Sequence, residues 1–535
     1  MGGTLEQRGL AEEVEALREL LRDRDRRIAE RDQVIAEKDE TIRHLQREYD
    51  ILRRIAFGPK TDKRPLPANA SAHPMLFPFL EQAERVARAN AAEGTVEILP
   101  PKAPEKKGRR PRKWPADAPV VRTTFELPEE DRVCGCGHPL HEIGEDSSRE
   151  LERFTLTVIH EIIRKKYSCR SCESGVRMAP GPDRVIDKGL LGPNFLAQVI
   201  VDRFGNHMPY HRLEKQYASE GLDLSRSVLQ RSMARVAELL EPISEQIKRD
   251  VLASDVIHTD DTPVVIANAT TGGSRKGRAW IYLDREGSHW YHFTQTRERD
   301  GPARILEDFQ GYLQADAYGG YDQLYSPDGA TEVACWAHVR RKFVDAEGTD
   351  PETAKEAIDM IRNLFAIERQ ARQAEFTPEQ LRDARQEYAL PILREFRQWL
   401  DCILLRMLPK SAIARAATYA HNQWDALMRY VEDGRLSIDN NAAERALRPF
   451  AVGRKNWLFF QNDTGGKTAS ILMSLLMSAK ALDLNPTLYF RDVLLRIARC
   501  SDVGKLTPRG WKEHFAAEVE SKRDEFVRRF VPKAQ

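Results

Sequence analysis

Residues 254–268, SDVIHTDDTPVVIAN, form an apolar and β-branched run that two consecutive acids, Asp260 and Asp261, interrupt. Such a run favours a β-strand. The glycine-rich segment TTGGSRKGR (270–278) comes next and predicts a turn. Two more strand-like runs follow, AWIYLDR (279–285) and HWYHFTQ (289–295). This order predicts an antiparallel meander of three strands.

A second acid ends another strand-like run. The helical pattern GPARILEDF (301–309) leads into GYLQADAYGGYDQLY (311–325), where a short apolar run ends at Asp316. An acid in or beside an apolar strand costs free energy unless it binds a cation or pairs with a base. Asp260 and Asp316 are therefore candidate functional residues.

A third acid follows a long helical region, about residues 350–434. The sequence GRLSIDNNAAERALRPFAVGRKNWLFF (434–460) predicts a helix that Asn440 or Asn441 caps and whose first turn carries Glu444. By itself, a glutamate here would pair with an arginine of the same helix. As a set, the three carboxylates supply the oxygen ligands that two Mg²⁺ or Mn²⁺ ions need to catalyse phosphoryl transfer.

Basic and aromatic residues accompany the acids. The residues that we expect to hold DNA phosphates are Arg340, Arg341 and Lys342 in CWAHVRRKF (335–343), and Arg448, Arg454 and Lys455 after the glutamate. Trp457 and Phe460 have two interpretations. They stack on a base at the cut DNA end, or they pack in the core.

The composition limits the class of protein. The 535 residues exceed what one hydrophobic core holds, so several domains are expected. The 83 Lys and Arg against 82 Asp and Glu give a net charge of +1, so any surface for nucleic acid must be local. The sequence contains no long apolar run and no basic-then-apolar start, which predicts a soluble cytoplasmic protein without a membrane span.

Four of the seven cysteines form two close pairs, Cys134/Cys136 and Cys169/Cys172. Between the pairs lies an alternating stretch, FTLTVIHEIIRKKYSC (154–169), that predicts strands of a hairpin. Paired thiolates across a hairpin are typical of a structural Zn²⁺ site. The first pair has a one-residue gap, so His138 or His141 is an alternative ligand.

The first 57 residues contain no proline and have an apolar residue at every seventh position, which predicts a coiled coil. These positions are Val14, Leu21, Ile28, Ile35, Ile42, Tyr49 and Ala56. The facing positions are basic in the middle of the coil, at Arg24, Arg31 and Lys38. The coil is therefore either a weak self-association device or a single solvated helix.

Proline and basic residues then dominate, and such a composition does not fold independently. In this linker, Arg109, Arg110, Arg112 and Lys113 predict DNA contact, with a solvated charge run as the alternative. Further on, three helical patterns (193–204, 209–220 and 225–240) fit a helix-turn-helix. Its third helix would present Arg226, Gln230 and Arg231 to a DNA groove, although an ordinary helical connector gives the same pattern.

Several motifs together resemble the transposases of the insertion sequence 66 family. They are QREYDILRRIAFGPKTDK (46–63), the CGCG and YSCRSC pairs, HTDDTPVVI, ADAYGGYDQLY, ACWAHVRRKF, DNNAAERALRPFAVGRKNWLFF and YFRDVLLRI (489–497). The resemblance implies a D-D-E transposase with catalytic Asp260, Asp316 and Glu444, acting on double-stranded DNA at element ends and at a target. It also implies a homo-oligomer, with companion proteins of the same element as further expected partners.

The expected fold class is multidomain α+β, and the resemblance implies a ribonuclease-H-like catalytic domain with an all-helical insertion. The domains are a coiled coil (1–57), a basic Pro-rich linker (58–122), a zinc-binding module (123–185), helix-turn-helix-like helices (186–245), the catalytic domain (246–470, insertion about 350–434) and a C-terminal helical region (471–535).

Two departures from the family pattern matter. The family usually has Asp-Glu-Thr-Pro at the first acid, whereas this chain has Asp-Asp-Thr-Pro, so Asp261 is an alternative to Asp260. The first cysteine pair is one residue shorter than expected. Two other functions share most of these features: a DNA-binding regulator with an inactive catalytic domain, and a two-metal nuclease without strand transfer.

Overall fold

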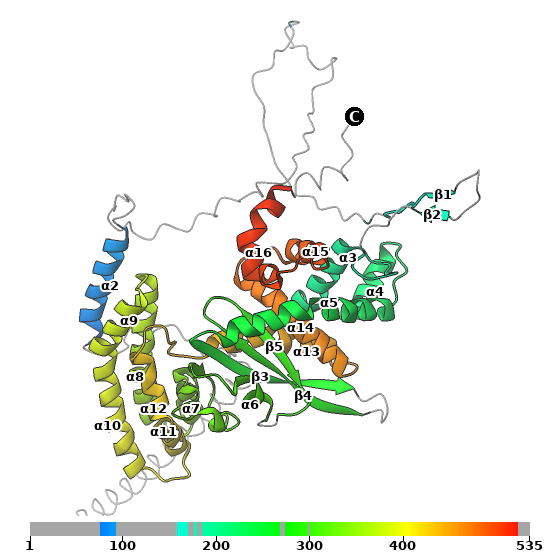
Figure 1. Cartoon of the computed structure of the whole chain (residues 1–535). Coiled ribbons are helices and arrows are strands. Elements are labelled where there is room, and N and C mark those ends of the chain that lie inside the picture. The colour runs from blue at the N-terminus through cyan, green and yellow to red at the C-terminus, as the bar shows by residue number, and fades with distance from the viewer. Residues whose placement is uncertain are drawn as a thin grey trace, which may run out of the picture.

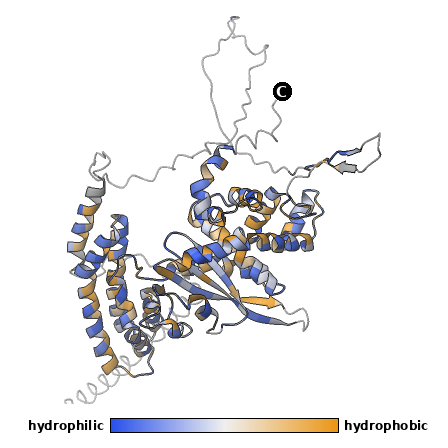
Figure 2. Ribbon diagram, viewed as in Figure 1, coloured by the Kyte–Doolittle hydropathy of each residue, from blue (hydrophilic) through white to orange (hydrophobic). Residues whose placement is uncertain are grey.

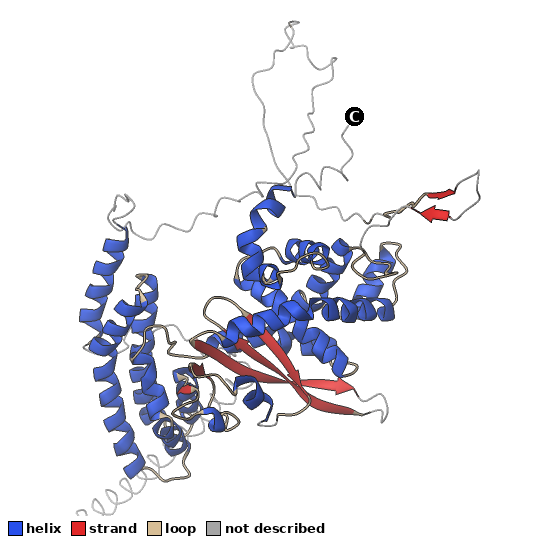
Figure 3. Ribbon diagram, viewed as in Figure 1, coloured by secondary structure: helices blue, strands red, loops and turns tan. Residues whose placement is uncertain are grey.

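The computed structural model describes residues 75–91, 138, 157, 159–168, 176–178, 184–267, 273–297 and 300–522. Helices surround a five-stranded sheet, so the fold is mixed α+β (Figure 1; Figure 3). The predicted coiled coil lies outside the described residues, as do Cys134, Cys136, Cys169, Cys172, Arg109, Arg110, Arg112 and Lys113. Those predictions remain predictions.

The predicted meander forms one half of the sheet. β3 (Val256–Ala267) pairs antiparallel with β4 (Ser274–Leu283), which pairs antiparallel with β5 (His289–Thr294). On its other edge β3 pairs in parallel with β6 (Tyr312–Gln314), which pairs in parallel with β7 (Thr331–Val333). The order is therefore β5-β4-β3-β6-β7, with the strand of the two consecutive acids in the centre.

The turn that we predicted for residues 270–278 is wrong from Ser274 onward, because β4 begins there. Gly277 lies inside this strand. A Cβ atom at that position would be 2.7 Å from Cε2 of Phe293 on the neighbouring strand. Glycine therefore allows the ring to lie against the backbone of β4, and it does not mark a turn.

Three helices precede the sheet, as predicted. They are α3 (Pro193–Ile200), which the π-helix η2 (Val201–Gly205) extends, α4 (Tyr210–Ser219) and α5 (Arg226–Leu252). α5 is longer than its predicted pattern, which ended at Leu240, and it continues through Pro242. The helix continues because its apolar stripe does: the later buried positions are Ile243, Ile247 and Val251.

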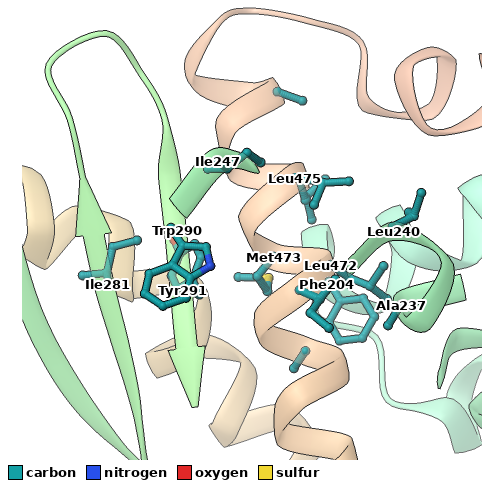
Figure 4. Packing of buried hydrophobic residues seen from close by; sticks show 14 of the residues in the cluster. Phe204, Ala237, Leu240, Ile247, Ile281, Trp290, Tyr291, Leu472, Met473 and Leu475 are labelled. Atoms are coloured by element: carbon teal, nitrogen blue, oxygen red, sulfur yellow. The ribbon is translucent and has the colours of Figure 1, made fainter. Parts of the chain in front are cut away.

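In the described C-terminal part, residues 516–522 are helical and follow a series of named helical elements. They are α13 (Asn441–Trp457), α14 (Asp463–Ala481), α15 (Pro486–Arg496), η6 (Val503–Leu506) and α16 (Pro508–His514). α14 packs between β5 and α5. In Figure 4, Trp290 and Tyr291 of the sheet lie on one side of Met473, and Ala237 and Leu240 of α5 lie on the other. One core therefore joins the sheet to the helices before and after it.

A second hydrophobic core lies in the helices between β7 and α13. They are α7 (Trp336–Ala346), α8 (Pro351–Gln373), α9 (Pro378–Ala384), η4 (Arg385–Ala389), α10 (Leu390–Arg406), α11 (Ala412–Asn422), α12 (Trp424–Met428) and η5 (Arg429–Val431). Hydrophilic and hydrophobic residues are interspersed along these helices (Figure 2). The predicted all-helical region of about 350–434 is thus present.

Of the segment predicted as linker (58–122), the structure describes residues 75–91, which contain the helix α2 (Leu76–Ala91). α2 packs against α8, and Phe79 and Ala83 are buried in the second core. The buried residues of α2 pack against helices from another part of the chain. The linker prediction is therefore wrong for these residues.

The remaining elements are short. They are β1 (Lys166–Ser168), β2 (Val176–Met178), α6 (Asp300–Leu306) and η3 (Asp322–Leu324). β1 and β2 pair antiparallel, and the second cysteine pair lies between them in the sequence, outside the described residues. The strand is shorter than predicted, since residues 159–165 have no regular structure. No helix in the described ranges has the length and apolarity to cross a bilayer.

Candidate active site

Three neighbouring elements carry the predicted catalytic acids. Asp260 lies within β3, Asp316 comes two residues after β6, and Glu444 lies in the first turn of α13. β3 and β6 are parallel neighbours, and α13 packs against β3. The structure thus places acids from distant parts of the sequence around the centre of one sheet.

The acids act on one another electrostatically. Burial above all, together with the negative charges of Asp316, Asp261 and Glu444, raises the pKa of Asp260 to about 7, against a hydrogen bond from the backbone N–H of Asp261. Burial also raises the pKa of Asp316. A group of half-buried carboxylates that repel one another is a place where a cation is stabilised.

The two consecutive acids of β3 have different surroundings. The Asp261 side chain is only 3% exposed and pairs with two arginines, Arg278 Nη1 at 2.8 Å and Arg297 Nη2 at 2.8 Å. Adjacent residues of a strand point to opposite faces, so only one of the two acids can face Asp316 and Glu444. The double ion pair of Asp261 favours Asp260 as the acid that is free to bind a cation.

Asn440 connects the helix of Glu444 to the strand of Asp260. Its Nδ2 donates to Thr259 O at 2.8 Å, and its Oδ1 lies 3.0 Å from His258 Nδ1. We predicted a capping role, but the Asn440 side chain makes no cap hydrogen bond although it occupies the N-cap position. The side chain is used instead to fix α13 against β3.

Glu444 has two partners from α7. Arg341 Nη2 lies 3.4 Å from Glu444 Oε1, and His338 Nε2 lies 3.5 Å from the same oxygen. Burial and the positive charge of Arg341 lower the pKa of His338, whereas the acids Glu444 and Asp316 raise it. In the described part of the chain, no three acidic, histidine or cysteine side chains lie close enough to form a preformed metal site.

Comparison with known proteins identifies the family. Residues 188–468, more than half of the chain, match the family described as Transposase IS66 family. The chain belongs to that family. Similar proteins of Sinorhizobium fredii (strain NBRC 101917 / NGR234) are "Uncharacterized protein y4hP", 30% identical over 462 residues (81% of each chain), and "Uncharacterized protein y4jD", 31% identical over 407 residues (72% of this chain and 79% of the relative).

A third relative from the same strain, "Uncharacterized protein y4qI", is 29% identical over 488 residues, 86% of this chain and 88% of the relative. The match to the IS66 family spans β3, β6 and the first turn of α13. All three candidate acids therefore lie within the part of the chain that defines the family.

Other predicted DNA contacts of this IS66-family chain lie on several elements. Arg448 and Lys455 are exposed on α13, and Arg340 is half-buried on α7. Arg454 donates to Thr262 Oγ1 and to Pro263 O, so it joins α13 to β3. On the exposed first turns of α5, Arg226 pairs with Glu214 of α4 at 3.1 Å and Arg231 Nε donates to Ser227 O at 3.2 Å.

The aromatic residues at the end of α13 and just after it differ in exposure. Trp457 and Phe460 are 8% and 6% exposed, so core packing is the correct interpretation of both. The exposed aromatic residue is Phe459, which is 50% exposed. Leu458 has a φ of 69°, and Phe459 N donates to Trp457 O at 2.9 Å, so the chain makes a γ-turn there.

Sequence reasoning missed three residues of the site. His338 lies in the motif CWAHVRRKF and Asn440 lies in DNNAAER, so the sequence contained both residues. We interpreted the first motif through its basic side chains and the second as a helix cap, and so assigned neither residue a role at the acids. Arg297 had no sequence signal at all. Its carboxylate partner is 36 positions away, and only the folded sheet brings the two together.

Proposed function

We propose that the chain is a DNA transposase that cuts and joins strands by means of metal ions held by Asp260, Asp316 and Glu444. Membership of the Transposase IS66 family supports this proposal. The observation that carries it is the placement of the three acids on β3, just after β6 and on α13, with Asp260 in the electrostatic field of Asp316 and Glu444. The proposal includes the ribonuclease-H-like catalytic domain that the resemblance implied, built on the sheet of order β5-β4-β3-β6-β7.

The donor set fits Mg²⁺ or Mn²⁺. All three candidate ligands are carboxylates, which hard divalent cations prefer. A pair of such ions would neutralise charge on the attacking and leaving oxygens of the phosphodiester. Asp260, Asp316 and Glu444 would hold the ions, Asn440 orients the helix of Glu444, and Arg341 lies where it can contact a phosphate.

The proposal assigns double-stranded DNA, both element ends and target, as the substrate. Arg226 and Arg231 on α5 and the segment 109–113 are proposed contacts to the element ends, with the helices around α5 acting as a helix-turn-helix. The two cysteine pairs would bind structural Zn²⁺. Residues 1–57 would support a homo-oligomer in the cytoplasm, with companion proteins of the element as further partners.

A cleavage and joining assay tests this function. Purified chain is incubated with Mg²⁺ and labelled DNA that ends in the inverted repeats next to its gene. We expect Asp260→Asn, Asp316→Asn and Glu444→Gln to abolish both reactions and to leave DNA binding within about threefold, because each removes a metal ligand and no phosphate contact.

The same assay separates the alternatives. Wild-type chain that cuts but never joins would be a nuclease, and chain that binds the repeats without cutting would be a regulator with an inactive domain. If Asp261→Asn abolishes cutting while Asp260→Asn does not, then the first metal ligand is Asp261.

A further inference from the structure

Arg297 connects the two loops that surround the carboxylates. It follows β5, and its Nε and Nη2 both donate to Asp261 Oδ1, at 3.1 and 2.8 Å. Its guanidinium carbon lies 3.8 Å from the centre of the Tyr318 ring. The Tyr318 hydroxyl in turn donates to the carbonyl of Arg297 at 2.6 Å. One arginine thus contacts the residue after Asp260 and the second residue after Asp316.

We propose that Arg297 is a positioning residue that fixes the loop of Asp316 against the strand of Asp260. The inference rests on the proposed function, since it assigns Arg297 the task of setting the separation of two metal-binding carboxylates. We name the group of Asp261, Arg297 and Tyr318 the loop clamp.

The loop clamp is suited to this task because its contacts have fixed geometry. Two donors of a planar guanidinium converge on one carboxylate oxygen, and the same plane stacks on an aromatic ring. Tyr318 adds a hydrogen bond to the backbone, so both the side chain and the main chain of Arg297 are held.

The hydrogen bonds of Arg297 go to the neighbour of a proposed metal ligand. They end on Asp261 Oδ1, and consecutive side chains of a strand point to opposite faces, so Arg297 binds Asp261 and not Asp260. Its positive charge also acts on the carboxylate of Asp316. Arg278 pairs with the other oxygen of Asp261 at 2.8 Å, which helps to hold that carboxylate in place. Residues that orient ligands in this way commonly change metal affinity or activity by about 10–100-fold when they are removed.

A metal-binding measurement tests the inference without relying on catalysis. Full-length chain is titrated with Mn²⁺ by calorimetry in the absence of DNA, and the Asp260→Asn variant defines binding at other places. We expect Arg297→Ala to raise the Kd for Mn²⁺ by about 10–100-fold, with a melting temperature close to that of the wild type. Tyr318→Phe, which keeps the ring and loses the hydroxyl, should raise it less.

Arg275 is a matched control. It lies on β4, is half-exposed like Arg297, and pairs with one acid, Asp463. We expect Arg275→Ala to leave the Kd for Mn²⁺ unchanged. If Arg275→Ala raises the Kd for Mn²⁺ as much as Arg297→Ala does, then the loss of any surface ion pair has this effect, and the inference is overturned.

Other results also decide the matter. Arg297→Lys keeps the positive charge but loses the planar guanidinium. If this variant binds Mn²⁺ with the Kd of the wild type, the charge alone is sufficient, which would contradict a positioning role. An unchanged Kd in Arg297→Ala, with wild-type chain that binds Mn²⁺ and cuts DNA, would overturn the loop clamp and leave the proposed function standing. Wild-type chain that binds no Mn²⁺ at the Asp260 site would overturn both.

Discussion

The sheet and the helical insertion both bury charge, but in opposite ways. In the insertion, the side chains of Arg385 and Glu368 are 1% and 9% exposed and form two parallel contacts of 2.8 Å. Arg385 also donates to three backbone carbonyls, those of Tyr430, Asp433 and Leu436. At the sheet, burial and then the like charges of the neighbouring acids Asp316, Asp261 and Glu444 raise the pKa of Asp260.

The difference separates a structural site from a candidate catalytic one. The charges of the insertion neutralise each other, and their hydrogen bonds are made within the protein, so they stabilise one conformation. The acids of the sheet repel one another, so folding holds them together at a cost in free energy. Loss of a charge should therefore damage stability in the insertion and activity in the sheet.

The largest effect is expected for activity at the sheet. Asp260→Asn should lower the rate of DNA cleavage by at least about 10³-fold, since a proposed metal ligand is lost. Its melting temperature without divalent cations should equal or exceed that of the wild type, because the repulsion among the acids is reduced. Cleavage kinetics and a melting curve on the same preparation test this prediction, and a variant that is inactive only because it is unfolded would contradict it.

The next largest effect is expected for stability in the insertion. Arg385→Ala should lower the free energy of unfolding by about 3–5 kcal/mol, because it leaves Glu368 buried without its partner. Urea unfolding measures the change. The double variant Arg385→Met with Glu368→Leu should recover much of the loss, and failure to recover any would mean that the backbone contacts of Arg385 dominate.

The pH dependence of stability should follow Asp260. Its pKa is about 7 in the folded chain against 3.8 ordinarily, so the folded state binds the proton more tightly. This contribution to stability is complete below about pH 4 and is lost as the pH rises through 7. Without divalent cations, the wild type should lose about 3 kcal/mol more than Asp260→Asn between pH 5 and pH 8. Equal pH profiles in urea unfolding would contradict this.

The smallest effect is expected at an exposed ion pair. Arg275 pairs with Asp463 on the surface, and both side chains are well exposed to solvent. Arg275→Ala should change the free energy of unfolding by less than about 1 kcal/mol, and less still at high salt. A loss as large as that of Arg385→Ala would mean that burial does not distinguish the two pairs.

The sequence was sufficient for features that local patterns determine. Alternating apolar residues predicted β3, β4 and β5, and helical periodicity predicted α3, α4, α5 and the insertion. The three acids were proposed because each one breaks, ends or follows such a pattern, and their catalytic role stays a prediction. The presence of a mixed α+β fold and the IS66 family were confirmed.

Features that depend on distant contacts were not predictable. The burial of Trp457 and Phe460 depends on where α13 ends against β3, since Phe460 N donates to Val265 O. The partners of Glu444 come from α7 and not from its own helix, about a hundred residues away. Arg297 acquires a role only when β5 is placed beside β3 through β4.

The helical insertion leaves the sheet and returns to it at the same point. Trp336 N donates to Ile438 O at 3.1 Å, and Asn440 N donates to Cys335 Sγ at 3.1 Å although these residues are 105 positions apart. A segment with adjacent ends imposes no particular length on what lies between them. Beyond α7, evolution could therefore lengthen, shorten or exchange this part of the protein without moving α13, because Asn440 and Arg454 anchor that helix directly to β3.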